Sequence, residues 1–259
     1  MARRRKSNRR RRGSFGFLYK LLSMLVICGA IVAALTLFFR VDTILVVGAH
    51  RYTAQEVIDA SGIQTGDNLF LLNKYAAADS ISTALPYIDT EGVWIRRRLP
   101  DTLIIEVEEC GTPLAAEQEG TVWLVSPKGK IVQQITPEEA ADYGRIDGCT
   151  LLAPSVGTPM ALATEYSYRQ TALLRLMAAL DAAEEMENVD AIHLGDASTL
   201  TMDYGGRFTV QLTYDADYAR KLRTLRMILD ESGAIQDNMT GTFDMRSEDG
   251  KVNLIQNVR

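Results

Sequence analysis

The longest apolar stretch of the chain lies near its N-terminus. Nineteen residues, 21–39, separate Lys20 from Arg40 and carry no charged side chain. At about 1.5 Å of rise per residue, a helix of this length spans roughly 28 Å, close to the thickness of the hydrocarbon core of a bilayer. Because apolar residues cover every side of such a helix, the pattern predicts a transmembrane helix over residues 21–39 and not a helix buried in a protein core.

A cleaved signal peptide is the other interpretation of this stretch. The apolar part of a signal peptide is usually about 7–15 residues long and is followed by a small-x-small cleavage site. The run here is longer, and it ends in Leu-Phe-Phe-Arg at residues 37–40. We therefore favour an uncleaved membrane anchor.

The segment after the anchor begins as a strand and continues as a helix. Residues 41–47 are mostly apolar or β-branched, as is typical of a strand, and Gly48 ends the run. Thr53 and Glu56 have the spacing of a capping box that opens a helix. Gly62 is placed to close that helix.

A second helix and two further strands complete this region. The helix is predicted over residues 73–85, and Pro86 stops it. Residues 93–96 and 103–108 alternate between apolar and polar side chains, which indicates strands with one buried face. Leu-Pro-Asp at residues 99–101 makes the turn between them. The predicted order is β-α-α-β-β.

The pattern in the remainder of the chain predicts strands in meander order with two embedded helices. Residues 122–132 and 200–212 each hold two apolar runs around a turn, which predicts two hairpins. Ser167 and Gln170 have the spacing of a capping box before the first helix, and Asp215 can cap the second. The predicted fold class is therefore α+β, with a mostly antiparallel sheet in this second region.

Charge divides the chain at the same place as the apolar run. Residues 1–39 hold nine of the 28 Lys and Arg and none of the 33 Asp and Glu, so residues 40–259 carry a net charge of −14. By the positive-inside rule, the basic tail stays in the cytoplasm, where it can contact anionic lipid, and the acidic body lies outside the cytoplasmic membrane. An acidic body also argues against nucleic-acid binding.

Two cysteines lie beyond the anchor. Cys110 and Cys149 could form a disulfide in an oxidising compartment, and their spacing does not decide whether they do. We favour unpaired thiols, because a body of this size does not need a covalent crosslink to fold.

The sequence contains no recognisable catalytic or metal-binding motif. His50 and His193 are the only histidines, and no zinc-ligand spacing, phosphate-binding loop, dinucleotide fingerprint or GxSxG occurs. We predict no enzyme activity, no cofactor, no metal and no small-molecule substrate. The alternative is a membrane-anchored, sortase-like cysteine transpeptidase that uses Cys110 or Cys149, His193 and an arginine. The glutamates just before Cys110 would raise the pKa of its thiol and weaken such a nucleophile.

Four motifs follow the anchor in a fixed order. They are VDTILVVG at residues 41–48, TAQEV at 53–57, GDNLF at 66–70 and RLPDTLIIEV at 98–107. In this order and spacing they resemble the POTRA domain of the FtsQ/DivIB family, whose members are bacterial cell-division proteins with one membrane span.

The second region is similar to the β domain of the same family. The matching motifs are the hairpin at residues 123–130, Lys221-Leu222 with Leu225, and FDMR at residues 243–246. One departure is Leu212-Thr213, where the family often has Leu-Gly. The resemblance implies a basic cytoplasmic tail, a transmembrane helix, a POTRA domain and a β domain with a C-terminal edge strand, at residues 1–20, 21–39, 40–110 and 111–259.

The function that the resemblance implies is that of a bitopic scaffold. Such a protein binds FtsL-type and FtsB/DivIC-type partners and supports septal peptidoglycan synthesis at the division site. Two other binding proteins are possible in principle. A POTRA chaperone for exported chains would be expected to carry tandem copies, and an anchored adhesin would be expected to carry surface repeats. Neither pattern occurs in this sequence.

The last predicted strand, residues 251–256, has no later element to cover it. An exposed edge strand presents N–H and C=O groups to which a partner strand can bind by β-augmentation. A strand that stays solvated or pairs internally is the alternative. The predicted partner-binding residues are Phe243, Met245, Arg246, Val252, Asn253, Leu254, Ile255 and Gln256.

Overall fold

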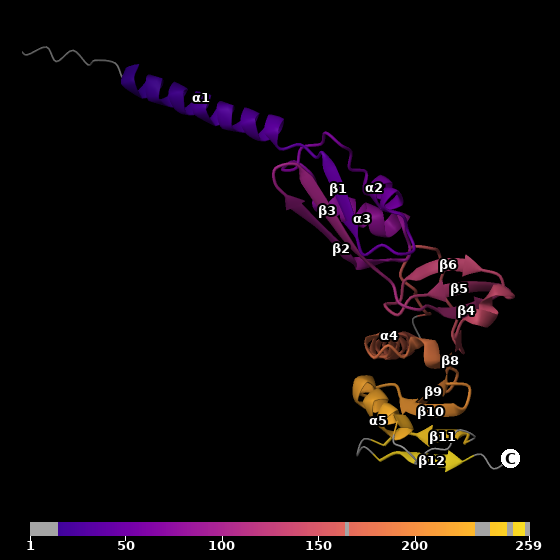
Figure 1. Ribbon diagram of the computed structural model, residues 1–259. Helices are drawn as coiled ribbons and strands as arrows, with labels where there is room; N and C mark the ends of the chain where they lie inside the picture. The colour runs from indigo at the N-terminus through magenta and orange to yellow at the C-terminus, as the bar shows by residue number, and fades with distance from the viewer. Residues whose placement is uncertain (1–14, 164–165, 231–238, 248–250, 257–259) are drawn as a thin grey trace, which may run out of the picture.

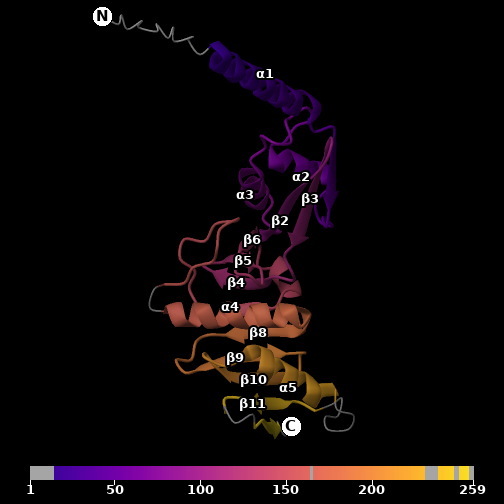
Figure 2. The same cartoon turned by 90° about the vertical axis from the view of Figure 1, so that its left-hand side faces the viewer.

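The computed structural model describes residues 15–163, 166–230, 239–247 and 251–256 (Figure 1). A long helix, a three-stranded unit and a nine-stranded unit follow one another along an elongated molecule (Figures 1 and 2).

The N-terminal helix, α1 (Phe15–Phe38), stands apart from the two units (Figure 1). Its residues Gly16–Phe38 are long and apolar enough to cross a membrane, and none of this stretch is buried in the protein. The helix begins six residues before the predicted start at residue 21, because Phe15 to Tyr19 continue the apolar pattern across the single charge of Lys20.

The three-stranded unit has the predicted β-α-α-β-β order. The sheet order is β1-β3-β2, with β1 parallel and β2 antiparallel to β3. The two helices pack on one face of this sheet and bury Val57, Ala77 and Ile81 against it. The elements are β1 (Thr43–Val47), α2 (Ala54–Ser61), α3 (Lys74–Ala84), β2 (Ile88–Arg98) and β3 (Thr102–Glu109).

The local signals at the ends of α2 are confirmed. The Thr53 side chain accepts from the backbone N–H of Glu56, and the Glu56 carboxylate accepts from the backbone N–H of Thr53. Gly62 closes the helix in the left-handed region at φ 67°. Only a residue without Cβ adopts that conformation readily, so a glycine stands there.

The nine-stranded unit is mostly antiparallel, as predicted. The sheet order is β12-β11-β10-β9-β8-β7-β4-β5-β6, and only β4–β7, β7–β8 and β10–β11 pair in parallel. The strands do not form a simple meander, because β7 pairs with β4 and not with its neighbour in sequence, β6. The strands are β4 (Leu114–Gln118), β5 (Thr121–Val125), β6 (Ile131–Ile135), β7 (Arg145–Asp147), β8 (Val189–His193), β9 (Thr199–Tyr204), β10 (Phe208–Thr213), β11 (Gly241–Asp244) and β12 (Asn253–Gln256).

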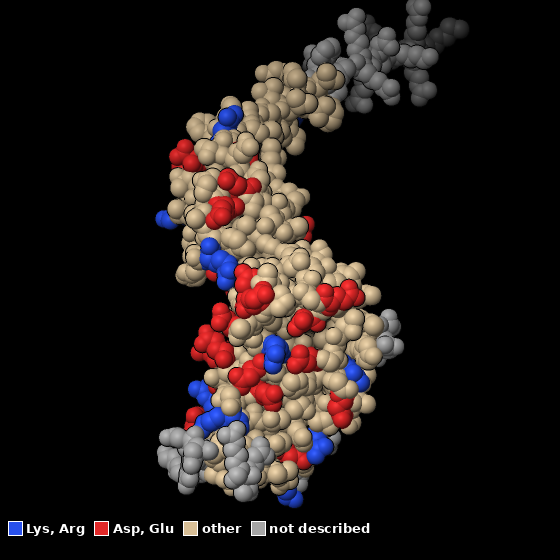
Figure 3. All heavy atoms as spheres, turned by 90° about the vertical axis from the view of Figure 1, so that its right-hand side faces the viewer, with Lys and Arg blue, Asp and Glu red and all other residues tan. Residues whose placement is uncertain are grey.

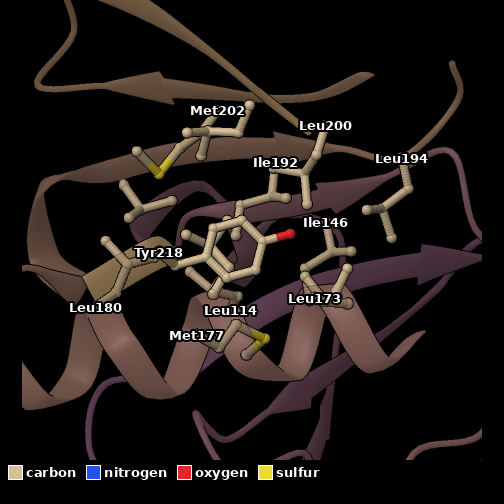
Figure 4. Packing of buried hydrophobic residues seen from close by; sticks show 14 of the residues in the cluster. Leu114, Ile146, Leu173, Met177, Leu180, Ile192, Leu194, Leu200, Met202 and Tyr218 are labelled. Carbon is tan, nitrogen blue, oxygen red and sulfur yellow. The ribbon is translucent and has the colours of Figure 1, made fainter. Parts of the chain in front are cut away.

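Two helices, α4 (Ser167–Ala182) and α5 (Tyr218–Asp230), bury their apolar sides against this sheet. Figure 4 shows Leu173, Met177 and Leu180 of α4 directed at strand residues, with the Tyr218 ring among them. All four are buried. Two short 3-10 helices, Glu139–Asp142 and Met186–Asn188, flank strands β7 and β8.

The predicted caps of these two helices are wrong. Ser167 lies inside α4, and the preceding Tyr166 makes no capping hydrogen bond. The Gln170 amide instead donates to the carbonyl of Met160 and accepts from the N–H of Leu162, so tertiary partners displace the local cap. At α5, the side chain of Asp217, not that of Asp215, accepts from the N–H of Arg220.

Hydrogen bonds and apolar contacts form a joint between the three-stranded unit and the nine-stranded unit. Lys130, at the turn before β6, is buried, and its Nζ donates to the carbonyls of Ser82 and Ile88 at 2.6 and 2.8 Å. The Tyr87 hydroxyl donates to Gln133 Oε1 at 2.6 Å, and the Tyr87 ring packs in a small core with β4, β5 and β6. These contacts hold the C-terminal end of α3 and the start of β2 on the second unit.

A candidate protein-interaction edge

Strand β12 forms one end of the nine-stranded sheet (Figure 1). It pairs antiparallel with β11, from Asn253 opposite Asp244 to Gln256 opposite Gly241. Within the described ranges of the chain, no strand pairs with the other side of β12. Every second backbone N–H and C=O group of this strand therefore points away from the sheet.

Gly241 lets β12 approach β11 closely. A Cβ atom at this position would lie 2.6 Å from the carbonyl oxygen of Ile255 and 3.2 Å from the Cα of Gln256. Both neighbours are backbone atoms, so β12 would have to move to make room. Sequence reasoning missed this residue, and its only signal was a glycine two residues before the FDMR motif.

The predicted site residues fall into two groups by exposure. Asn253, Leu254, Ile255 and Gln256 are exposed, with 37% of Leu254 and 59% of Ile255 accessible. Val252, just before the strand, is half-buried and packs against the main core. The structure thus brings four of the eight residues together on an open edge.

Phe243 and Met245, two of the predicted site residues, lie in the core and not on the open edge. They are 0% and 1% exposed, and the Phe243 ring packs on that of Phe208 with centroids 5.0 Å apart. The alternation of β11, continued to Met245 just after it, turns these side chains towards the core. Both side chains belong to the core that lies behind the edge strand.

Arg246 lies on the surface beside the end of β11. Its Nε and Nη2 atoms donate to the two carboxylate oxygens of Asp244 at 2.9 and 2.7 Å. The hydrogen bonds from Arg246 lower the pKa of Asp244 to about 2. The pair fixes the guanidinium beside the open strand.

A polar hollow adjoins this pair at the N-terminal end of α5. Lys221 is buried there, and its Nζ donates to the Ser247 carbonyl at 2.5 Å. The hydrogen bond ties α5 to the segment that follows β11. Sequence reasoning missed this hollow, since its lining comes from two stretches of chain that are far apart in the sequence. Its lining includes Asp215, Asp217, Arg220, Lys221 and Arg246.

Cys110 and Cys149 have raised pKa values, whereas a catalytic thiolate needs a lowered one. Burial raises the pKa of Cys110 to about 12 and that of Cys149 to about 11. Both are free thiols, and Cys110 Sγ donates to Asp89 Oδ1 at 3.3 Å. The His193 ring lies between Asp147 and Asp203, with N···O distances of 3.3 and 2.9 Å. The geometry therefore gives the transpeptidase alternative no support.

Acidic side chains dominate the face of the two units that Figure 3 shows. They do not form a metal site, because no group of three His, Cys, Asp or Glu residues in the described ranges could hold an ion.

Comparison with known proteins relates this chain to bacterial division proteins. Residues 39–109 match the POTRA domain of the FtsQ type. Over longer stretches the chain is similar to proteins named FtsQ and DivIB. Its helix α1 fits a single-pass membrane protein.

The similar FtsQ and DivIB proteins come from several bacteria. The cell division protein FtsQ of Geotalea daltonii is 26% identical over 201 residues, which are 76% of this chain and 69% of that protein. FtsQ of an Anaeromyxobacter species is 31% identical over 139 residues, 50% of this chain and 46% of that protein. The cell division protein DivIB of Clostridium botulinum is 30% identical over 97 residues, 38% of this chain and 37% of that protein. The chain thus spans about two thirds of the first relative and less than half of the other two.

Proposed function

We propose that this chain is a bitopic scaffold of the bacterial division complex and not an enzyme. In this proposal residues 1–20 are cytoplasmic, residues 21–39 span the membrane, and a POTRA domain (40–110) and a β domain (111–259) lie outside at the septum. The match to a POTRA domain of the FtsQ type, the similarity to FtsQ and DivIB proteins and the long apolar helix α1 support this arrangement. The protonated state favoured for Cys110 and Cys149 supports a role without nucleophilic catalysis.

The binding mode we propose is β-augmentation at β12. The observation that carries it is a terminal strand whose second side has no partner in the described chain. A segment of a FtsL-type or FtsB/DivIC-type protein would pair with that side as a further strand. Its backbone would supply affinity, and Leu254, Ile255 and Arg246 would select its side chains. Holding these partners outside the membrane would let the scaffold support septal peptidoglycan synthesis.

Paired proline substitutions test this mode in the full-length protein. Proline removes a backbone N–H, and alternate residues of a strand direct their N–H groups to opposite sides. The two variants are Asn253→Pro/Ile255→Pro and Leu254→Pro/Gln256→Pro. One of them breaks the pairing of β12 with β11. The other removes only the N–H groups that point away from the sheet. We expect the variant that lacks only the outward N–H groups to keep its unfolding free energy and to lose capture of the co-reconstituted partners. A folded variant that lacks the outward donors and still captures them would remove the mechanism.

The proposed topology is tested separately in cells. Replacing Arg3–Arg5 and Arg9–Arg12 by Glu should disturb the insertion of residues 21–39, because basic residues hold the tail in the cytoplasm. Protease protection of the tail and of the C-terminal region in intact cells measures the outcome. A matched Arg→Lys variant keeps the charge and should insert normally. Unchanged topology in the Glu variant would mean that these arginines do not set it.

A further inference from the structure

The POTRA domain contacts the end of α1 through the loop at residues 68–72. The side-chain amide of Asn68 donates to the carbonyls of Leu35 and Thr36 at 3.0 and 3.3 Å. These carbonyls belong to the last turn of α1, where a helix leaves such groups without partners. The Phe39 and Phe70 rings meet edge to face with centroids 5.1 Å apart. The loop is therefore joined to the point where the apolar helix ends.

Large apolar side chains beside this joint are exposed. Leu69 is fully buried and holds the loop in the POTRA core, but Phe70 is 44% exposed and Leu71 77% exposed. Tyr75, in the first turn of α3, is 88% exposed. The opposite end of α3 lies at the joint with the β domain, so Tyr75 is at the α1 end of the helix (Figures 1 and 2).

The turn between β2 and β3 lies at the same end of the domain (Figures 1 and 2). The carbonyl of Asp101 accepts from the N–H of Asp42, two residues after Arg40, at 2.8 Å. Leu99 in this turn is 54% exposed. We refer to Phe70, Leu71, Tyr75 and Leu99 as the α1-proximal tip.

Cationic side chains accompany the α1-proximal tip. The Arg97 guanidinium lies 5.9 Å from the centroid of the Phe70 ring and donates to the Leu72 carbonyl at 3.3 Å. Arg40 and Arg98 are exposed near it. The carboxylates at this end are partly engaged, since Asp67 accepts from the N–H of Gln64 and Asp101 from the hydroxyl of Thr102. Apolar and aromatic side chains next to basic ones suit a bilayer interface with anionic lipid.

We propose that the α1-proximal tip rests in the lipid interface of the bilayer that α1 spans. This inference rests on the proposed membrane anchoring of residues 21–39. Any bilayer around α1 ends within a few residues of Phe39, and the loop is hydrogen-bonded to that turn, so the tip lies at the level of the lipid interface. Docking would fix the rotation of the POTRA domain about α1. Through the rigid joint at Lys130, it would also set the height of β12 above the membrane.

Tryptophan reporters in the full-length protein, reconstituted in phosphatidylcholine/phosphatidylglycerol vesicles, test this docking. The background is Trp94→Phe/Trp123→Phe, which removes both native tryptophans. The reporters are Leu71→Trp and Leu99→Trp, two positions on separate loops, so that one misfolded variant leaves the other informative. The matched control is Leu152→Trp, because Leu152 is 60% exposed in the β domain. The reporter for the anchor is Leu25→Trp within α1.

We expect the two tip reporters to show a blue-shifted emission and to lose intensity when the lipid is replaced by its brominated form. Leu152→Trp should emit as in water and resist the bromolipid. A quenched Leu25→Trp with unquenched, water-like tip reporters would overturn the docking and leave the anchor in place. An unquenched Leu25→Trp would overturn the anchor and the docking together. A blue shift without quenching would mean that a second copy of the chain covers the tip, which also overturns the proposal.

Discussion

The Nζ atom of Lys130 lies 2.8 Å from the carbonyl oxygen of Ile88, across the boundary between the POTRA domain and the β domain. The same ammonium donates to the carbonyl of Ser82, and only 6% of the residue is exposed. One lysine of the β domain thus satisfies two backbone acceptors of its neighbour. This contact, the Tyr87–Gln133 hydrogen bond and the apolar contacts of Tyr87 together hold the two domains in place.

Replacing Lys130 by Ala should therefore destabilise the joint. The change leaves two buried carbonyls without donors, and we expect a loss of about 2–4 kcal/mol in the free energy of unfolding. Denaturant unfolding of the full chain in detergent micelles measures it. Arg96→Ala is the control, since Arg96 forms an exposed ion pair with Glu106 and should cost less than about 1 kcal/mol. Equal costs for the two variants would contradict the role of Lys130.

Gly241→Ala should loosen β12. The added methyl group overlaps the backbone of Ile255, so we expect a cost of about 1–3 kcal/mol and faster amide hydrogen exchange in residues 253–256. Gly195→Ala is the matched control, because no atom lies within 4 Å of a Cβ there. That variant should be neutral or more stable by about 0.4–1 kcal/mol. Unchanged exchange in β12 of the Gly241 variant would mean that the strand tolerates the methyl group.

The Asp244–Arg246 pair should make stability depend on acid pH. Arg246 lowers the pKa of Asp244 from 3.8 to about 2 in the folded protein. Because the folded pKa is below the unfolded one, the contribution is present above pH 4 and is lost as the pH falls towards 2. Arg246→Met should reduce the unfolding free energy at neutral pH only modestly, since solvent screens this exposed pair. The difference from the wild type should vanish near pH 2, and a constant difference would contradict this origin.

Cys110 and Cys149 should resist alkylation in the folded protein. Their pKa values are raised to about 12 and about 11, mainly by burial, whereas an unfolded thiol titrates near 9. At pH 8 we expect iodoacetamide to label both far more slowly than in denaturant, as measured by mass spectrometry of the peptides. Rapid labelling of native Cys110 would contradict its protonated, half-buried state.

The same shifts predict a loss of stability in alkali. A folded pKa above the unfolded one favours the protonated thiol, so the contribution is full below pH 9 and is lost as the pH rises through about 11 and 12. Cys110→Ser/Cys149→Ser should flatten the fall in unfolding free energy above pH 9. An equally steep fall in this variant would assign the loss to other groups.

Much of the fold could be predicted because its signals are local. Thr53 and Glu56 find each other within one helical turn, so their capping box could be recognised from spacing alone. The same spacing at Ser167 and Gln170 failed, because the Gln170 amide bonds to Met160 and Leu162 in a loop that the tertiary fold brings near. Local patterns give local structure only where no distant partner competes.

The candidate site was partly predictable for a related reason. The alternation around Phe243 and Met245 indicates a strand, but it does not say which face the rest of the chain covers. Their burial beside Phe208 follows from the parallel pairing of β10 with β11, which joins segments about thirty residues apart. The exposed residues of β12 could be predicted, since no later element was expected to cover that strand.

The sequence by itself determined the long apolar helix, the β-α-α-β-β order of the first unit and the strand at the C-terminal edge, because hydrophobic period and turn residues act over a few positions. Only the tertiary structure decided that β7 lies beside β4, that Lys130 reaches the carbonyl of Ser82 across 48 residues, and that Asn68 ties its loop to α1. The physical reason is that a buried donor must find an acceptor, and which acceptor is in reach depends on how the whole chain packs.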